Sequence, residues 1–291
     1  MSNDRTLKIW DQYTLNLLYS YTDSCQLKVS VQINQTSFMV ATSCEQFRML
    51  NIYTDSIRTL AYVTNSFNFN SLPNALIQFN STTVILGTSN GTIQIFDLNS
   101  NSSSFVQMID EKSAVNALCA INKDLFASGL NAINLNIWNL TNSSKVISLY
   151  QGTYVYSIII SNDKKYLISG DFFYKILFWT LSNWTLYKRI DIAATKMTQL
   201  NDDLIVHLRT SNITIGCGVY VSNISTNLSY TKISSTYYYS MAKLDNNFVA
   251  LGSSNDIELW ELKDLSRTRL AKNKKRAHIY TISDISQYKG I

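Results

Sequence analysis

Histidine, paired carboxylates and cysteine most often carry acid–base, nucleophilic or metal chemistry, and this sequence spaces them widely. It contains two histidines, His207 and His278, and the adjacent carboxylates Asp202 and Asp203. His207 stands inside the apolar run DDLIVHL, so a hydrogen-bonded strand residue is favoured over a general base. Asp202 and Asp203 lie in a polar turn, which favours two solvated side chains over an acid–base pair.

The four cysteines, Cys25, Cys44, Cys119 and Cys217, lie far apart and show no CxxC spacing. Buried thiols are therefore favoured over a metal site or a disulfide. No GxxxxGK or GxGxxG phosphate-binding motif occurs, and no Cys/His spacing indicates zinc. The sequence predicts a protein that is not an enzyme, with no catalytic residue, no metal, no other cofactor and no small-molecule substrate.

The positive charge is concentrated near the C-terminus. The whole chain carries a net charge of +5, and residues 263–276 alone carry +6. Such a cluster could bind an acidic protein, RNA or an import receptor, although a solvated outer strand and loop is favoured. No aromatic residue interrupts the cluster, which weakens a single-stranded nucleic-acid interpretation. The basic residues are Lys263, Arg267, Arg269, Lys272, Lys274, Lys275 and Arg276.

The composition predicts a strand-rich, soluble protein. Hydrophobic residues make up 46% and charged residues 15%, with 18 Tyr and 12 Phe, and aromatic residues favour strands. The 29 Asn residues can close turns that the 9 Gly and 1 Pro cannot supply. No apolar run approaches the roughly 20 residues that cross a bilayer, and no signal pattern opens the chain. We expect an intracellular, cytoplasmic protein that contacts no membrane, with the nucleus as the alternative. The ten Asn-x-Ser/Thr sequons, including Asn80, Asn139, Asn183 and Asn212, are then a by-product of composition.

A short strand that ends in an aromatic residue, first seen as TLKIWD, recurs along the whole chain. The successive spacings of these marker aromatics are 43, 43, 42, 41, 41 and 40 residues. Each interval holds four β-rich runs separated by turn residues, which is typical of propeller blades. We expect the markers to pack between sheets as core residues. They are Trp10, Tyr53, Phe96, Trp138, Trp179, Tyr220 and Trp260.

These runs resemble the WD40 repeat family over nearly the whole chain. The family's Trp-Asp ending is intact at Trp10-Asp11, altered at Phe96-Asp97, Trp138-Asn139 and Trp260-Glu261, and missing at Tyr220-Val221. Its Gly-His pair survives only as the remnants Gln151-Gly152 and Ala277-His278. The resemblance implies one all-β domain over residues 1–291, a seven-bladed WD40-type β-propeller.

Ring closure is the second implication of the resemblance. WD40 rings close with one blade built from both chain ends, so residues 5–21 should pair with the run 278–286 in a blade that lacks one strand. The alternative, favoured by the turn-like residues 2–4, is that this sequence is a fragment of a longer propeller.

The family also braces its blades through hydrogen bonds among a histidine, an aspartate and a serine or threonine. His278 is placed for that role by the resemblance. The matching aspartate is present as Asp4 but replaced by Asn90, Ala132 and Ser254. Those three blades are therefore expected to lack the full network.

The resemblance places the start of each inner strand near the face where WD40 propellers dock partners. There the runs TYVYSI, STYYYSM and AHIYTI carry Tyr154, Tyr156, Tyr237, Tyr239, His278 and Tyr280, with Lys196 at the matching place between them. Tyrosine is a favoured interface anchor, although packing between blades is the favoured alternative. The function expected is a scaffold or adaptor that binds proteins or peptide segments through this face and the rim. The alternative is an RNA- or ribonucleoprotein-associated propeller that uses residues 263–276.

Overall fold

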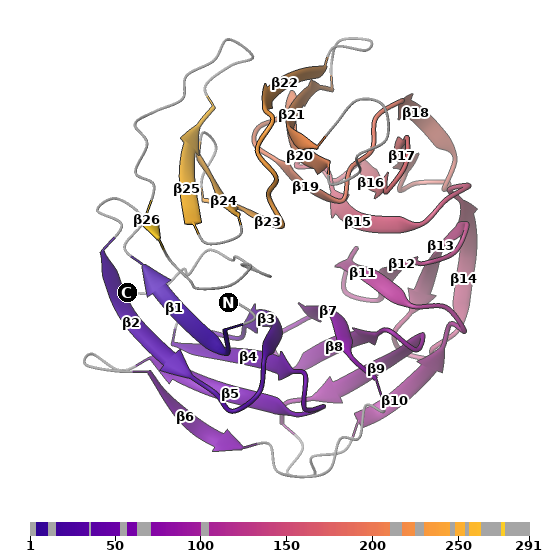
Figure 1. Ribbon diagram of the computed structural model, residues 1–291. Helices are drawn as coiled ribbons and strands as arrows, with labels where there is room; N and C mark the ends of the chain where they lie inside the picture. The colour runs from indigo at the N-terminus through magenta and orange to yellow at the C-terminus, as the bar shows by residue number, and fades with distance from the viewer. Residues whose placement is uncertain are drawn as a thin grey trace.

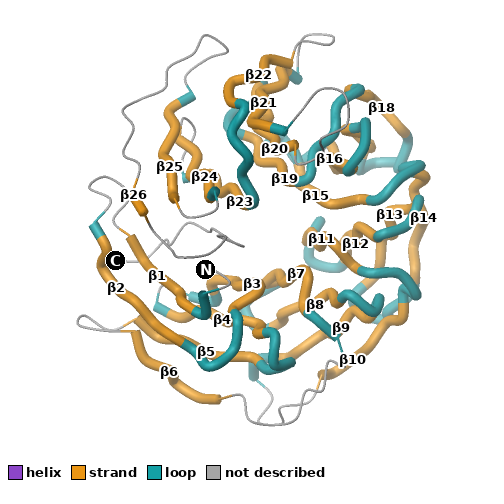
Figure 2. The backbone as a smooth tube through the Cα atoms, in the orientation of Figure 1, coloured by secondary structure: helices purple, strands orange, loops and turns teal. Residues whose placement is uncertain are grey.

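The computed structural model describes residues 4–10, 16–34, 36–52, 57–62, 71–99, 105–209, 217–224, 230–244, 248–253, 256–262 and 275–276. Their strands form small antiparallel sheets arranged in a ring, seen as a ribbon in Figure 1 and as a tube in Figure 2. The fold is an all-β propeller, as the repeat predicted. The described part of the chain contains no helix long and apolar enough to span a membrane.

Six sheets have four strands each, and we number them as blades 1 to 6 in chain order. The inner strands are β3 (Leu27–Gln32), β7 (Pro73–Gln78), β11 (Val115–Ala120), β15 (Val155–Ile160), β19 (Lys196–Gln199) and β23 (Ser240–Lys243). The second strands are β4 (Ser37–Thr42), β8 (Thr83–Thr88), β12 (Leu125–Leu130), β16 (Tyr166–Asp171), β20 (Leu204–Arg209) and β24 (Phe248–Gly252). Each inner strand contacts the inner strand of the next blade, from β3 round to β23.

The outer half of each blade follows the same order. The third strands are β5 (Phe47–Ile52), β9 (Thr92–Asp97), β13 (Asn134–Asn139), β17 (Ile176–Thr180), β21 (Gly218–Asn223) and β25 (Asp256–Glu261). The outermost strands are β6 (Ile57–Tyr62), β10 (Phe105–Asp110), β14 (Lys145–Tyr150), β18 (Leu186–Ile190), β22 (Tyr230–Ser234) and β26 (Lys275–Arg276).

The prediction of seven blades is corrected to six four-stranded blades and one two-stranded sheet. The N-terminal strands β1 (Thr6–Trp10) and β2 (Leu17–Thr22) pair with each other and stand between blade 6 and blade 1 in the ring (Figure 1). Leu7 and Ile9 pack against Leu27 and Phe38 of blade 1. The C-terminal run 278–286, expected to complete this sheet, lies outside the described residues.

Asparagine closes the hairpin between the inner and second strands, as the composition predicted. In blade 2, the Asn80 side-chain oxygen accepts hydrogen bonds from the backbone N–H groups of Thr82 at 2.9 Å and Thr83 at 2.8 Å. This local turn suits asparagine because its short side chain reaches the backbone two residues further on. The same turn is made in blades 1, 3 and 5 by Asn34, Asn122 and Asn201.

The hydrophobic core lies between neighbouring sheets, and each cluster joins two of them. Phe96, Trp138, Trp179 and Trp260 are all buried in these clusters, so their prediction as core residues is confirmed. In every blade, the marker position can be located as the residue of the third strand that pairs with the second residue of the second strand.

Two of the marker positions are corrected by this pairing. Ser222 rather than Tyr220 occupies the marker position of blade 5, because it pairs with the second residue of β20 as Trp179 does in β16. Leu50 occupies it in blade 1, where Tyr53 lies outside the described residues. Tyr220 is nevertheless buried between blades 4 and 5.

Glycine recurs in the second strand where the next blade's inner strand comes closest. A Cβ atom on Gly170 would lie 2.6 Å from the Ala194 carbonyl oxygen and 2.8 Å from the Ala194 Cβ. Gly87 and Gly129 face the following inner strand in the same way. Only a hydrogen atom fits at these places, so the residue type sets how closely successive blades pack.

Gly170→Ala is expected to lower the free energy of unfolding by about 1–3 kcal/mol, because the added methyl group forces blades 4 and 5 apart. Urea unfolding followed by tryptophan fluorescence measures the change. Lys123→Ala, at an exposed turn position, serves as the control. An unchanged urea midpoint for Gly170→Ala would show that the two blades do not meet so closely.

Candidate partner-binding surface

The segments that lead into the inner strands carry side chains that turn back and brace the blade. Glu111 and Gln151 each lie four residues before an inner strand, β11 or β15. Glu111 accepts hydrogen bonds from Asn136 Nδ2 at 2.7 Å and Trp138 Nε1 at 2.8 Å, and one from the Ser128 hydroxyl. These bonds fix where β11 begins relative to its own sheet.

Blade 4 has the same brace with a neutral acceptor. Gln151 Oε1 accepts a hydrogen bond from Ser169 Oγ at 2.6 Å, and Ser169 Oγ in turn accepts one from Trp179 Nε1 at 3.0 Å. Gln151 belongs to the remnant Gln-Gly pair seen in the sequence. It precedes β15 as Glu111 precedes β11, and like Glu111 it accepts the hydrogen bond of a serine on the second strand.

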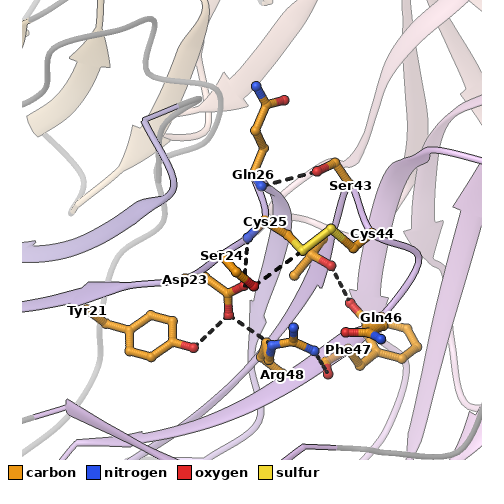
Figure 3. A network of polar contacts seen from close by, with 11 residues as sticks. Tyr21, Asp23, Ser24, Cys25, Gln26, Ser43, Cys44, Gln46, Phe47 and Arg48 are labelled. Carbon is orange, nitrogen blue, oxygen red and sulfur yellow. Dashed lines mark hydrogen bonds and ion pairs between the residues drawn. A yellow bond between two sulfur atoms is a disulfide. The ribbon is translucent and has the colours of Figure 1, made fainter.

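In blade 1 the equivalent residue is Asp23, shown in Figure 3. Its carboxylate accepts hydrogen bonds from Arg48 Nε at 2.9 Å and the Tyr21 hydroxyl at 2.7 Å. Burial alone raises the pKa of Asp23, but the hydrogen bonds from Tyr21, the Cys25 backbone and Arg48 outweigh burial and hold this pKa below its usual value. The ion pair is buried and connects the two-stranded sheet to blade 1.

Next to this ion pair, Cys25 and Cys44 form a disulfide (Figure 3). The prediction of separate buried thiols was wrong for these two residues. Leu27 pairs with Thr42 across the first hairpin of blade 1, so the residues two positions further out lie opposite each other, with a Cα–Cα distance of 5.8 Å. Cys119 and Cys217 are free, and burial raises the pKa of the Cys119 thiol to about 12.

Blades 5 and 6 use other residues for the brace. His207 Nε2 lies 2.9 Å from Ser222 Oγ inside blade 5, so the prediction of a hydrogen-bonded strand histidine is confirmed. In blade 6 the Glu258 carboxylate accepts hydrogen bonds from Tyr238 at 2.7 Å and Trp260 at 3.1 Å. The brace therefore differs chemically from blade to blade.

Blade 4 displays an aromatic patch, which we define as Tyr154, Tyr156, Phe172, Phe173 and Tyr174. Ring centroids are 5.8 Å apart for Tyr154 and Phe173 and 5.4 Å apart for Tyr156 and Phe172. Tyr154 is 40% exposed and Tyr174 is 51% exposed. Neighbouring rings at these distances support one another in a fixed arrangement.

Asp171 holds the two loops of the aromatic patch together. One carboxylate oxygen accepts hydrogen bonds from the backbone N–H groups of Phe173 at 3.0 Å and Tyr174 at 2.7 Å. The other accepts one from Thr153 Oγ1 at 2.6 Å. The turn that carries Phe173 is thus tied to the segment that carries Tyr154, so the patch is ordered before any partner binds.

A pocket of about 170 Å³ opens at the inner strands of blades 1 to 5. Its lining is mostly polar, with a smaller apolar part from residues such as Leu76 and Ile158. Its polar side chains come from five different inner strands, and we call Ser30, Asn74, Asn116, Tyr156 and Lys196 the channel collar. The described part of the chain contributes no Asp or Glu side chain to this lining. Tyr156 belongs to both the aromatic patch and the channel collar.

The structure brings together part of the predicted arc. Tyr154, Tyr156 and Lys196 lie on adjacent blades 4 and 5, and Tyr156 and Lys196 line one pocket. Tyr237 and Tyr239 form a separate pair on blade 6, with centroids 4.7 Å apart. Between them, Tyr238 is the residue that packs into the core.

The remaining predicted site residues fall mostly outside the described chain. His278 and Tyr280 lie there, as do Lys263, Arg267, Arg269, Lys272 and Lys274. Lys275 and Arg276 form strand β26 of blade 6. Sequence reasoning missed Phe172, Phe173, Tyr174, Asn74 and Asn116. The run DFFYK, an aromatic triplet in a turn, was the signal available for three of them.

Comparison with known proteins establishes the fold and no family. No family model matches the chain, and no curated protein sequence matches it. Among solved structures, the chain is similar to the computationally designed protein Ika8, with a TM-score of 0.70 over 97% of this chain and 84% of that one. The identity between the two is 19%, so the likeness concerns the fold alone.

Proposed function

We propose that this chain is a non-enzymatic scaffold that binds a protein or peptide segment through the aromatic patch. The observation that carries the proposal is five neighbouring aromatic rings, from the start of β15 and from a turn tied to it by Asp171, one of which, Tyr156, also lines the pocket. Aromatic residues, tyrosine among them, are the usual anchors of protein interfaces. A preordered patch also loses little conformational entropy on binding.

We further infer that the propeller is of WD40 type. Support comes from the serine–tryptophan hydrogen bonds of blades 3 and 4, at 3.1 Å for Ser128 and Trp138 and 3.0 Å for Ser169 and Trp179. Glu111 and Gln151 stand where the family resemblance implies histidine.

The Cys25–Cys44 disulfide is evidence about the compartment in which the scaffold works. Disulfides persist in oxidising compartments and are rare in the cytoplasm. The cytoplasmic location expected from the sequence is therefore not part of this proposal.

The double variant Phe173→Ala/Tyr174→Ala is expected to lower the recovery of bound partners at least tenfold, because hot-spot aromatics each contribute about 2 kcal/mol or more. Quantitative affinity purification of wild type and variant measures this. Tyr187→Ala is the matched control, since Tyr187 is an exposed aromatic on the outermost strand of the same blade. Equal recovery with the patch variant, or an equal loss with the control, contradicts the proposal.

An RNA-associated propeller remains the second candidate, on the charge of +6 carried by residues 263–276. Phosphate binding falls steeply with added salt, whereas docking on aromatic rings does not. Salt dependence of the recovered complexes therefore separates the two candidates.

A further inference from the structure

We propose that the channel collar binds a carboxylate side chain, Asp or Glu, of the peptide segment that docks on the aromatic patch. This inference rests on the proposed function and names the chemistry of its partner. It is carried by the charge of the pocket, an unpartnered buried amide, the pocket's size and its continuity with the patch.

Among the described residues that line the pocket, Lys196 carries a positive charge and none carries a carboxylate. Within the described residues, Lys196 has no ion pair, whereas Arg48, Lys145, Lys165 and Arg189 each have one. A lysine with no carboxylate beside it attracts an anion to the pocket, most strongly at low salt.

The collar also offers a hydrogen-bond donor that has no acceptor. Asn116 Nδ2 is shielded from solvent and has no hydrogen-bond partner in the described part of the chain. A shielded donor left unpaired costs about 1–3 kcal/mol, so an acceptor that reaches it recovers that energy. Burial raises the pKa of Tyr156, which keeps its hydroxyl protonated and able to donate. A carboxylate has two oxygens and accepts from several such donors at once.

The size of the pocket selects a side chain rather than a larger ligand. Its volume of about 170 Å³ is smaller than the roughly 300–1,000 Å³ of sites that hold drug-sized molecules. The apolar side chains of Leu76 and Ile158 in the lining suit the methylene stem of a glutamate, with the carboxylate directed to the collar. Because Tyr156 belongs to both surfaces, a peptide anchored on the aromatic patch reaches the pocket directly. This continuity favours a peptide over a free small anion.

Selection from a random 12-residue peptide library displayed on phage tests the proposal, using the whole chain as bait. We expect binders to share Asp or Glu at a fixed distance from an aromatic or aliphatic residue. The acidic preference should disappear with Lys196→Met and reverse toward Lys or Arg with Lys196→Glu. Lys123→Met, which changes an exposed lysine outside the pocket, should select the same peptides as wild type.

Binding of one selected peptide then gives the magnitude. Its Kd is expected to rise roughly 10- to 100-fold when the acidic residue is changed to its amide, and similarly with Asn116→Asp, which places a negative charge in the collar at unchanged shape. In a ¹⁵N-labelled chain, the Asn116 side-chain NH₂ signals should shift with the acidic peptide but not with its amide form. Acetate alone should shift them only weakly, and an equal shift with acetate would mean that the site binds free anions.

The outcomes separate this inference from the proposed function. Selected peptides that need Phe173 and Tyr174 but carry no acidic residue would uphold the scaffold and overturn the carboxylate site. An acidic preference that persists with Lys196→Met would overturn it as well. A library that yields no binder would count against both.

Discussion

Replacing Glu111 by alanine is expected to lower the free energy of unfolding by about 3–5 kcal/mol. The Glu111 side chain is 2% exposed and accepts hydrogen bonds from Ser128, Asn136 and Trp138. Its removal leaves the Ser128 hydroxyl and the Asn136 amide without this acceptor, while Trp138 Nε1 keeps its bond to Ser128, and each such loss is costly inside a protein. Urea unfolding at neutral pH measures the change.

Two further variants identify the cause of that loss. Glu111→Gln should cost less than Glu111→Ala, because Gln151 shows that an amide oxygen can accept the serine hydrogen bond of a brace. Lys145→Ala removes a cation that lies 3.9 Å from Glu111 but is 42% exposed, so we expect a loss within about 1 kcal/mol. A Glu111→Ala variant no less stable than Lys145→Ala would show that the carboxylate does not brace blade 3.

Lowering the pH from 7 to 5 is expected to remove about 2 kcal/mol of stability through His207. Complete burial, and to a smaller extent the charge of Arg209, lowers the pKa of His207 to about 3. In the unfolded chain this pKa is about 6.5. Below pH 6.5 His207 binds a proton in the unfolded chain but not in the folded one. The contribution of neutral His207 to the free energy of unfolding is therefore complete above pH 6.5 and is lost as the pH falls toward 3.

Urea unfolding of wild type and His207→Gln at pH 7, 6 and 5 isolates this effect. The variant should lose about 2 kcal/mol less than wild type between pH 7 and 5, whatever its stability at pH 7. His278→Gln is the control because His278 is the only other histidine of the chain. Parallel pH profiles for wild type and His207→Gln would mean that the pKa of His207 in the fold is no lower than in the unfolded chain.

The fold could be predicted from the sequence because its determinants are local and repeated. Asn80 and its equivalents close the same hairpin in four blades, and each blade repeats the same four strands. The marker pattern failed in the two blades whose marker position does not hold an aromatic residue. Leu50 fills its place by size, and Ser222 fills its place because the neighbouring His207 supplies the bulk and the hydrogen bond.

The site could be predicted only in part, because it is assembled across blades. Tyr154, Tyr156 and Lys196 follow a pattern along the inner strands and could be found from it. Asn74 and Asn116 become candidate binding residues only because five inner strands converge on one pocket, and the sequence of a single repeat does not show this convergence. The Cys25–Cys44 disulfide depends on the pairing of a hairpin over a separation of 19 residues, so spacing alone did not indicate it.

The braces differ in their chemistry from blade to blade, so they share no sequence motif. A carboxylate, an amide, an ion pair, an imidazole–hydroxyl contact and a phenol–carboxylate contact all serve as braces in different blades. A search for one residue type at these places would therefore overlook most of the blades, whereas a search for a hydrogen bond between the strands would find them.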